Sequence, residues 1–359
     1  MIPDEVIKAL SAATGISSEK LIIKPLVHGG LINRSFKMNS FSDERSWLLQ
    51  NINHSIFTDP ENLNTNYLAL YRFSIQKPGK VRIPVPIFFS EGQCLFIDTN
   101  GEVWRAMEWI AGSCTIEKVH HIEQARDVAQ TFALFTHSLS KDFSSDLLKP
   151  TLPHFHDLSY RYQQFEEAFS NASGERLSSA LSLIEEMKKR SAYCRLFEYF
   201  KTHPTGFPYR VMHHDAKISN ILFEEKTGKV WGPIDLDTVM PGLYFSDLGD
   251  MIRSLVGSID ENSSDLPAMQ IKEDIYEELV NSYSKIMEND WTTEEKKYKH
   301  ASGLMLVYMQ TLRFLADHLK GDVYYQVSYP GQNLNRSMNQ LILLQRLEDF
   351  LFEKYHFKV

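Results

Sequence analysis

The sequence has few cysteines and no long apolar run. Its 359 residues include three cysteines, Cys94, Cys114 and Cys194, which form no Cys-x-x-Cys pair and show no metal-ligand spacing. We therefore expect reduced, buried thiols rather than a disulfide framework or a zinc site. No stretch of about 18 uninterrupted apolar residues occurs, so we expect no ordinary transmembrane helix. The first residues lack a basic segment before an apolar core, which predicts no signal peptide, a cytoplasmic location and no membrane partner.

The chain also lacks an excess of positive charge. It has 38 lysines and arginines against 46 aspartates and glutamates, a formal net charge of −8. Nucleic acid is therefore not expected as a partner, because a duplex needs many cations along its phosphates. The hydrophobic fraction of 43% and charged fraction of 23% are ordinary for a globular protein. No internal repeat is visible, and the length favours two lobes over one compact domain.

The first third of the chain alternates between short apolar runs and turns. We predict a helix over 3–14, a helix that begins at Asp59, and strands over 21–26, 35–39, 47–52, 87–90, 95–98 and 103–109. This pattern indicates an N-terminal antiparallel sheet of about five strands with one helix laid on it. Gly29-Gly30 is either a loop over nucleotide phosphates or a plain hairpin turn. Residues 107–112 are either a linker that contacts an adenine ring or a strand end with core residues.

The rest of the chain has mainly helical periodicity. We predict helices over 122–139, 177–199, 247–255, 270–290, 295–320 and 334–354. The fold class is therefore α+β. The change of pattern predicts an N-terminal nucleotide-binding lobe at 1–110 and a larger, mainly helical lobe at 111–359.

Chemistry-bearing side chains gather in the central stretch. Residues 211–223 read VMHHDAKISNILF and residues 231–237 read WGPIDLD. Asp215 and Asn220 are five residues apart on a predicted tight loop, and Asp235 follows the next strand. This arrangement suits phosphoryl transfer from a magnesium nucleotide, because Asp215 can orient and deprotonate a hydroxyl while Asn220 and Asp235 hold the metal. Asp237 is a candidate second metal ligand or substrate contact, and His213 is expected to be structural.

Several segments resemble a known superfamily. Residues 211–220 and 234–242 resemble the aminoglycoside phosphotransferase and choline kinase superfamily of protein-kinase-like enzymes. Within it, residues 29–33, 49–54, 235–242 and 313–324 look like the N-acetylhexosamine 1-kinase group, sometimes labelled mucin-desulfating protein. The resemblance implies a bilobal protein-kinase-like fold, ATP with Mg²⁺, and transfer of the γ-phosphate to the anomeric hydroxyl of N-acetylglucosamine or N-acetylgalactosamine. No Cys-x-Pro-x-Arg or Ser-x-Pro-x-Arg segment supports sulfatase chemistry.

The residue pattern and the resemblance together give candidate binding residues. For the nucleotide they are Gly29, Gly30, Asn33, Lys37, Gln50, Glu108 and Ile110. For the sugar acceptor they are Asp237, His214, Arg313, Asp317 and Tyr324. The non-functional alternative for Arg313 and Asp317 is a surface ion pair between side chains one helical turn apart.

Two departures from the superfamily pattern concern the N-terminal lobe. Gln50 stands where many kinases have the nucleotide lysine, and Asn51 stands where the N-acetylhexosamine group tends to have arginine. Neutralisation of phosphates is therefore expected from Lys37, from Arg34 or from the metal.

Two alternative functions remain open from the sequence. The same chemistry could serve choline, ethanolamine, homoserine, methylthioribose or an aminoglycoside as acceptor. The missing lysine also leaves open a nucleotide-binding scaffold without activity.

Overall fold

The protein is described by a computed structural model that covers residues 2–26 and 32–359. Two compact units make up the chain, and each takes its residues from several segments. The first unit consists of residues 1–116, 138–153 and 220–241, and the second of residues 117–137, 154–219 and 242–359. The predicted lobes, 1–110 and 111–359, remain a prediction.

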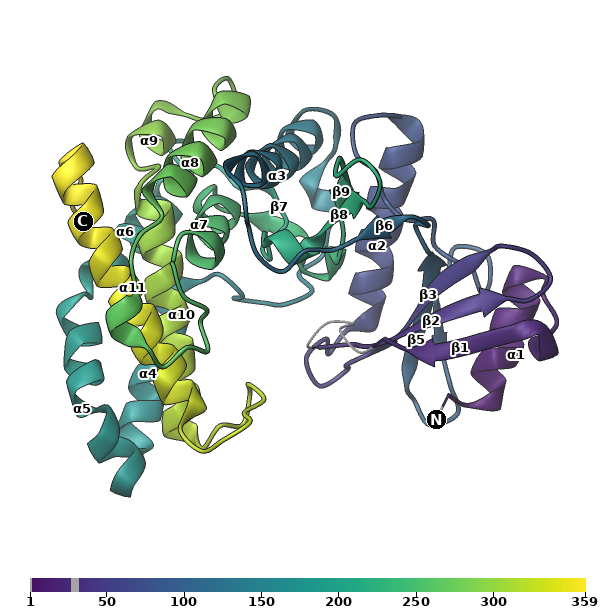
Figure 1. Ribbon diagram of the computed structural model, residues 1–359, viewed down its shortest axis with the longest axis horizontal. Coiled ribbons are helices and arrows are strands. Elements are labelled where there is room, and N and C mark those ends of the chain that lie inside the picture. The colour runs from purple at the N-terminus through teal and green to yellow at the C-terminus, as the bar shows by residue number, and fades with distance from the viewer. Residues whose placement is uncertain (1, 27–31) are drawn as a thin grey trace. The chain divides into compact units, whose positions relative to one another are not determined.

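A five-stranded antiparallel sheet forms the centre of the first unit (Figure 1). Its strands are β1 (Leu21–Pro25), β2 (Arg34–Ser40), β3 (Ser46–Ile52), β4 (Leu95–Ile97) and β5 (Val103–Glu108), in the order β1-β2-β3-β5-β4. Helix α1 (Asp4–Thr14) covers one face, where Val6 and Leu10 pack with Trp47, Leu49 and other apolar side chains. The predicted α+β class and antiparallel sheet are confirmed. Residues 87–90 are not a strand, since only isolated bridges form at Pro86 and Ser90.

The opposite face of this sheet carries a polar row. Because side chains alternate along a strand, the register Ser35–Gln50–Arg105 puts these three residues on one face, and Phe36, Leu49 and Ala106 on the other. Helix α2 (Pro60–Gln76) begins after Asp59, as predicted, with proline in its first turn.

A second sheet in the first unit holds the metal-binding segment predicted above. Strands β6 (Ser113–Cys114), β8 (Ile221–Glu224) and β9 (Val230–Pro233) form it in the order β6-β8-β9. Short helical turns lie at η1 (Ser18–Lys20), η2 (Ser145–Leu147) and η4 (Leu236–Thr238). The elements α3 (Ile122–Asp142), η3 (Ile218–Asn220) and β10 (Met240–Gly242) extend over unit boundaries.

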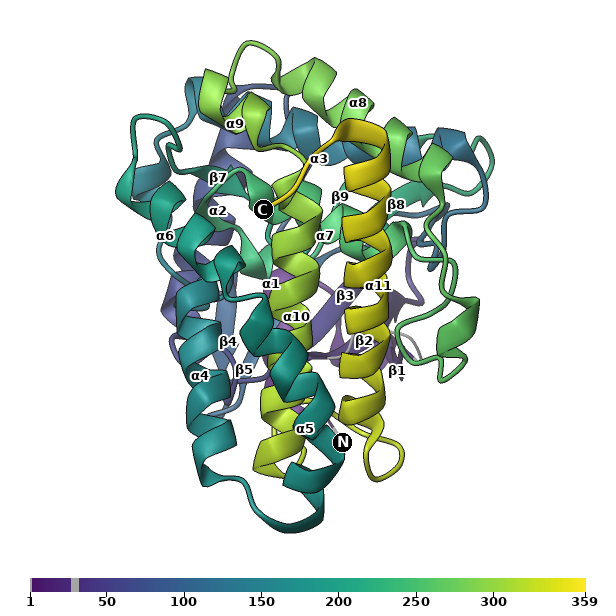
Figure 2. The ribbon, with the colours of Figure 1, turned by 90° about the vertical axis from the view of Figure 1, so that its left-hand side faces the viewer.

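The second unit is mainly helical, as predicted. Its elements are α4 (Leu158–Asn171), α5 (Gly174–Lys189), α6 (Ala192–Thr202), β7 (Arg210–Met212), α7 (Phe245–Leu255), η5 (Leu266–Ala268), α8 (Glu273–Met287), α9 (Thr293–Lys297), α10 (Ala301–Lys320) and α11 (Gln332–Tyr355). Helix α10 is the central one and packs against α4, α7 and α11; Figure 2 shows α10 and α11 running side by side. No helix within the described residues is long and apolar enough to span a bilayer.

Two helix predictions were wrong, and α4 was not predicted. Residues 177–199 are two helices, because α5 ends at Lys189 and α6 begins at Ala192. The guanidinium of Arg190 donates a hydrogen bond to Glu348 on α11. Residues 295–320 also divide, since a capping box of Thr292 and Glu295 begins the short helix α9, which ends before α10 starts. Both breaks depend on contacts or caps that a hydrophobic period does not register.

Candidate active site

The polar row of the first unit ends in a buried ion pair. Gln50 accepts a hydrogen bond from Arg105 Nε at 2.9 Å and donates one to Ser35 Oγ at 3.1 Å. The guanidinium of Arg105 then pairs with both carboxylate oxygens of Asp237, with 2.8 Å between Nη2 and Oδ2. The two side chains are only 6% and 4% exposed. Burial opposes the charge of Arg105, but Asp237 and then Asp235 raise the pKa of Arg105 above its usual value.

Asn33 extends this network to the turn before β2. Its amide nitrogen donates to Asp237 Oδ2 at 3.0 Å, and its carbonyl oxygen accepts from the backbone N–H of Asn53 at 3.0 Å. Asp237 therefore has a partner on both oxygens. Asn33 and Gln50, both predicted to bind nucleotide, lie in one network with Arg105, which the sequence analysis did not identify.

The hairpin of β8 and β9 brings Asn220 and Asp235 to the same end. Ile221 pairs with Pro233, and the backbone N–H of Ile234 donates to the carbonyl of Asn220 at 2.9 Å. Asn220, which accepts this hydrogen bond, directly precedes β8, and Asp235 directly follows Ile234, which donates it. The two predicted metal ligands therefore lie next to each other at this end of the hairpin. Asp235 adopts a left-handed backbone with φ 59°, a conformation that aspartate tolerates better than most residues.

Two further contacts fix the segment after Asp235. Thr151 donates its hydroxyl to the carbonyl of Asp237 at 2.6 Å, and Asn66 donates its amide to the carbonyl of Val239 at 3.1 Å. Both donors lie in the first unit. The segment from Asp235 to Val239 is thus held through its side chains and its backbone.

The remaining predicted nucleotide residues are distributed along the first unit. Lys37 lies with its ammonium 4.3 Å from the ring centroid of Trp109, a cation–π arrangement. Glu108 ends β5 and is exposed, and the carbonyl of Ile110 accepts from Ser113 Oγ at 2.6 Å. Gly29 and Gly30 lie outside the described residues.

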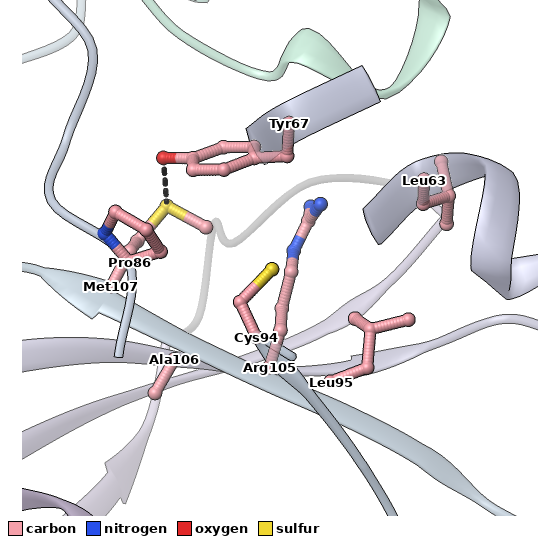
Figure 3. A pocket seen from close by; sticks show the side chains of 8 residues that line it. All are labelled: Leu63, Tyr67, Pro86, Cys94, Leu95, Arg105, Ala106 and Met107. Carbon is pink, nitrogen blue, oxygen red and sulfur yellow. Dashed lines mark hydrogen bonds between the residues drawn. The ribbon is translucent and has the colours of Figure 1, made fainter. Parts of the chain in front are cut away.

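A small recess lies between α2 and the sheet, on the Arg105 side. Figure 3 shows Tyr67, Met107, Cys94 and Arg105 around it, with Leu63, Pro86, Leu95 and Ala106 completing the lining. The hydroxyl of Tyr67 donates to the carbonyl of Pro84 at 2.7 Å and lies 3.6 Å from the Met107 sulfur. Burial raises the pKa of the Cys94 thiol to about 11, which favours the protonated thiol in this packed position.

In the second unit, Asp247 fixes the loop that carries Asp215. Its oxygens accept the backbone N–H groups of His213 at 2.9 Å and His214 at 2.8 Å. Burial raises the pKa of Asp247 to about 7, although both hydrogen bonds act to lower it. Asp215 forms an ion pair with Lys217 at 2.9 Å and stays 26% exposed in its side chain.

His214, the residue before Asp215, has a left-handed backbone and a buried side chain. Its φ is 66°, and its Nδ1 lies 2.7 Å from Ser246 Oγ. Ser246 also hydrogen-bonds His156 Nδ1. Gly242 leaves space for the imidazole, since a Cβ there would stand 2.4 Å from His214 Cε1. The ring of His213 packs edge-on against Phe132, which agrees with its expected structural role.

Aromatic side chains and one arginine pack next to these histidines. The Phe155 ring stacks on His156 with centroids 4.6 Å apart and lies 6.5 Å from the His214 ring. Arg313 lies over Phe155 at 5.1 Å and over Tyr324 at 5.9 Å. The predicted acceptor residues His214, Arg313 and Tyr324 are thus connected by ring contacts through Phe155 within the second unit.

Asp317 binds the backbone of the loop that follows α10. It accepts the backbone N–H groups of Val323, Tyr324 and Tyr325 at 2.8–3.0 Å. Asn333 adds a fourth hydrogen bond to the same carboxylate at 2.9 Å. Asp317 therefore fixes the loop after α10 instead of pairing with Arg313 on the surface.

Residues outside the predictions complete these sites: Arg105, Asn66 and Thr151 in the first unit, and Phe155, His156, Arg161 and Ser246 in the second. For Arg105 the sequence did hold a signal, because an arginine occupies an inward position on a strand that is otherwise apolar on that face. Within the described residues, no group of three or more His, Cys, Asp or Glu side chains is placed to hold a metal ion.

Comparison with known proteins identifies relatives of this architecture. Residues 25–279 match the model of a family described as the phosphotransferase enzyme family. An aminoglycoside phosphotransferase from Alicyclobacillus acidocaldarius has a TM-score of 0.64 at 14% identity, over 99% of this chain and 96% of its own. A microcompartment-associated aminopropanol kinase has a TM-score of 0.63 at 15% identity, over 98% of both chains. Spectinomycin phosphotransferase, solved with ADP and spectinomycin, has a TM-score of 0.56 at 14% identity, over 97% of this chain and 99% of its own. The predicted phosphotransferase family and protein-kinase-like fold are thereby confirmed, while the N-acetylhexosamine 1-kinase group stays a prediction.

Proposed function

Because the chain belongs to the phosphotransferase enzyme family, we propose that it transfers the γ-phosphate of ATP to a sugar hydroxyl. The proposed acceptor is the anomeric hydroxyl of N-acetylglucosamine or N-acetylgalactosamine. The observation that carries the proposal is the fixed His213–Asp215 segment, in which Asp247 accepts two consecutive backbone N–H groups. Such a tether fixes the backbone that carries Asp215, and a hydroxyl-rich acceptor needs several polar groups held in place around it.

Asp215 is the proposed base. Its carboxylate is partly exposed and anchored by Lys217, so it can accept a hydrogen bond from an incoming hydroxyl. Phosphoryl transfer through a loose transition state asks mainly for orientation from this group. His214, Arg313 and Tyr324 are the proposed acceptor contacts. The contacts of Asp237 and Asp317 favour positioning roles for these two carboxylates.

Asn220 and Asp235 are the proposed Mg²⁺ ligands. Their donor set, one amide oxygen and one carboxylate, is the hard-oxygen chemistry that Mg²⁺ prefers. The ion binds few protein groups in nucleotide enzymes and takes its other ligands from phosphates and water, so two side chains at one end of the β8–β9 hairpin fit it. When bound, Mg²⁺ neutralises phosphate charge.

The nucleotide is proposed to bind to the first unit through Gly29, Gly30, Asn33, Lys37, Gln50, Glu108 and Ile110. Support comes from the ADP bound to spectinomycin phosphotransferase, which has the same fold. Lys37 and Gln50 lie on the sheet face opposite α1. The position of the missing lysine is taken by Gln50, and the nearest buried cation is Arg105.

The test is ATP consumption with a panel of acceptors: both N-acetylhexosamines, choline, ethanolamine, homoserine, methylthioribose and an aminoglycoside. We expect turnover with an N-acetylhexosamine that Asp215→Asn abolishes. Asp265→Asn, a change at an exposed aspartate, is the matched control and should retain full activity. The sugar proposal fails if neither N-acetylhexosamine exceeds the Asp215→Asn background while another acceptor does. Retained ATP binding with no turnover for any acceptor would favour the scaffold instead.

A second candidate acceptor class comes from the relatives, since aminopropanol and aminoglycosides carry amines. The charge of the surface beside His214 bears directly on this choice.

A further inference from the structure

Two arginines lie together beside the proposed acceptor contacts. Arg161 on α4 donates from Nε and Nη2 to the carbonyl of Phe155 at 3.3 and 3.2 Å, and from Nη1 to Gln164 at 2.8 Å. Arg313 on α10 donates from Nη1 to Gln310 at 3.1 Å. All these acceptors are neutral. Across residues 2–26 and 32–359, neither guanidinium forms an ion pair with a carboxylate.

Most of the other partly buried arginines pair with a carboxylate, although Arg336 also has only neutral acceptors. Arg105 pairs with Asp237, Arg210 with Glu295, and Arg253 with Asp250 and Glu261. Protein interiors rarely hold an ionised group without an opposite charge. Arg161 and Arg313 therefore form a local excess of two positive charges, in contrast to Arg210 and Arg253 of the same unit.

The aromatic rings around Arg313 hold its guanidinium in place without neutralising it. Phe155 lies 5.1 Å and Tyr325 5.5 Å from its central carbon, and Tyr324 lies 5.9 Å away. The Tyr324–Tyr325 backbone is fixed by the carboxylate of Asp317. Arg161 is fixed through the same Phe155, whose carbonyl it binds.

The positive charges of Arg161 and Arg313 act on each other and on His156, which is linked to the residue before Asp215. Burial and then Arg313 lower the pKa of Arg161 to about 10. Burial, His214, Arg313 and Arg161, in that order, lower the pKa of His156 well below its usual value. His156 shares Ser246 with His214, which directly precedes Asp215. A second cation placed at this surface would meet the same repulsion.

We propose that Arg161, together with Arg313, is a charge filter that determines acceptor specificity by rejecting cationic acceptors. The inference rests on the proposed function, in which the acceptor hydroxyl binds at Asp215. It separates this protein from relatives whose acceptors carry amines, and it assigns the neutral sugar rather than an amino alcohol as the acceptor class.

Glucose and glucosamine are the sharpest pair of acceptors, because they differ in one hydroxyl against one ammonium group. The readout is the ratio of their kcat/KM values at pH 6.5, in the wild type, Arg161→Gln and Arg161→Lys. We expect the wild type to prefer glucose. Arg161→Gln should reduce the ratio about tenfold or more, since a unit charge within several ångströms acts strongly at an effective dielectric of about 20. Arg161→Lys keeps the charge and should keep the preference.

Salt dependence adds a readout that a merely structural role would not move. Raising the ionic strength to about 1 M shortens the Debye length to about 3 Å, so the wild-type ratio should fall while that of Arg161→Gln changes little. The melting temperatures of all three proteins are compared to establish that they are folded.

The filter is overturned if the wild type uses glucosamine as well as glucose, or if a folded Arg161→Gln keeps the wild-type ratio. If neither glucose nor glucosamine is phosphorylated, the ratio is measured on propanediol against aminopropanol, and the N-acetylhexosamine proposal is tested separately with the acceptor panel. Preference for aminopropanol in that pair also overturns the filter. In the absence of any turnover, calorimetric binding of the same two pairs decides: weaker binding of the cation, relieved in Arg161→Gln, supports the filter, and equal binding overturns it.

Discussion

The buried pair of Arg105 and Asp237 permits a prediction with a definite magnitude. The change is Arg105→Met, which keeps an unbranched apolar stem but removes the guanidinium and its charge. Both partners are at most 6% exposed in their side chains, so among the described residues Asp237 would be left as a buried carboxylate with Asn33 as its remaining side-chain partner. Breaking a buried pair in this way costs about 3–5 kcal/mol. For a domain of this size the melting temperature should fall by roughly 10 °C.

Urea denaturation followed by tryptophan fluorescence is the assay. Trp47 and Trp104 lie in the core between α1 and the sheet and report on the first unit. Arg126→Met is the matched control, because its partner Glu278 forms an exposed pair in which Arg126 is 46% accessible. That control should lose less than about 1 kcal/mol.

The double variant Arg105→Met with Asp237→Leu separates two contributions to the loss of stability. One is the attraction between the two groups, and the other is the cost of leaving the Asp237 carboxylate buried without its cation. Replacing both members of a buried pair by apolar residues is often close to neutral. We therefore expect the double variant to be more stable than Arg105→Met alone. A loss under about 1 kcal/mol for Arg105→Met, equal to that of the surface control, would refute the reasoning.

Three further predictions follow from individual contacts. Gly242→Ala should reduce kcat at least tenfold in the ATP assay, because its Cβ would stand 2.4 Å from the His214 ring and displace it; an unchanged kcat would contradict this. Asp247→Asn should lower kcat more than it changes KM, since the amide NH2 replaces one of the two oxygens that each accept a backbone N–H group; the same kinetics test it. Burial lowers the pKa of His300 from 6.5 to about 4, so the folded state disfavours the proton and its stability falls as the pH drops below about 6.5. Between pH 7.5 and 5, the wild type should lose about 2 kcal/mol more than His300→Asn, whose carbonyl can still accept from Tyr276, by urea denaturation.

The predictable part of this protein is local in the sequence. Asp215, Asn220 and Asp235 lie within 21 residues of one another, and strand and turn patterns suffice to put Asn220 and Asp235 at one end of a hairpin. The sheet and α2 followed from alternation and from a proline after a capping residue. The helices followed from their period except where caps or distant charges broke them.

The unpredicted part depends on partners far apart in the chain. Arg105 and Asp237 are separated by 132 positions, and no periodicity links them. Arg161 lies on α4, whose helical pattern was not recognised, so its proximity to Arg313 could not be inferred. Asp317 was expected to contact substrate or to pair with Arg313, and only the path of the following loop shows that backbone N–H groups occupy it.

Each compact unit uses a buried carboxylate to fix a segment that carries proposed catalytic residues. In the second unit Asp247 binds the backbone on either side of the His213–His214 bond, and His214 has a left-handed backbone. In the first unit Asp237 binds Arg105, and Asp235, two residues earlier, is also left-handed. Such backbone costs on the order of 1–3 kcal/mol and persists only where its surroundings over-determine it. The same tethers therefore explain why the strain is retained. They hold it at His214, which precedes the proposed base Asp215, and at Asp235, which is a proposed metal ligand.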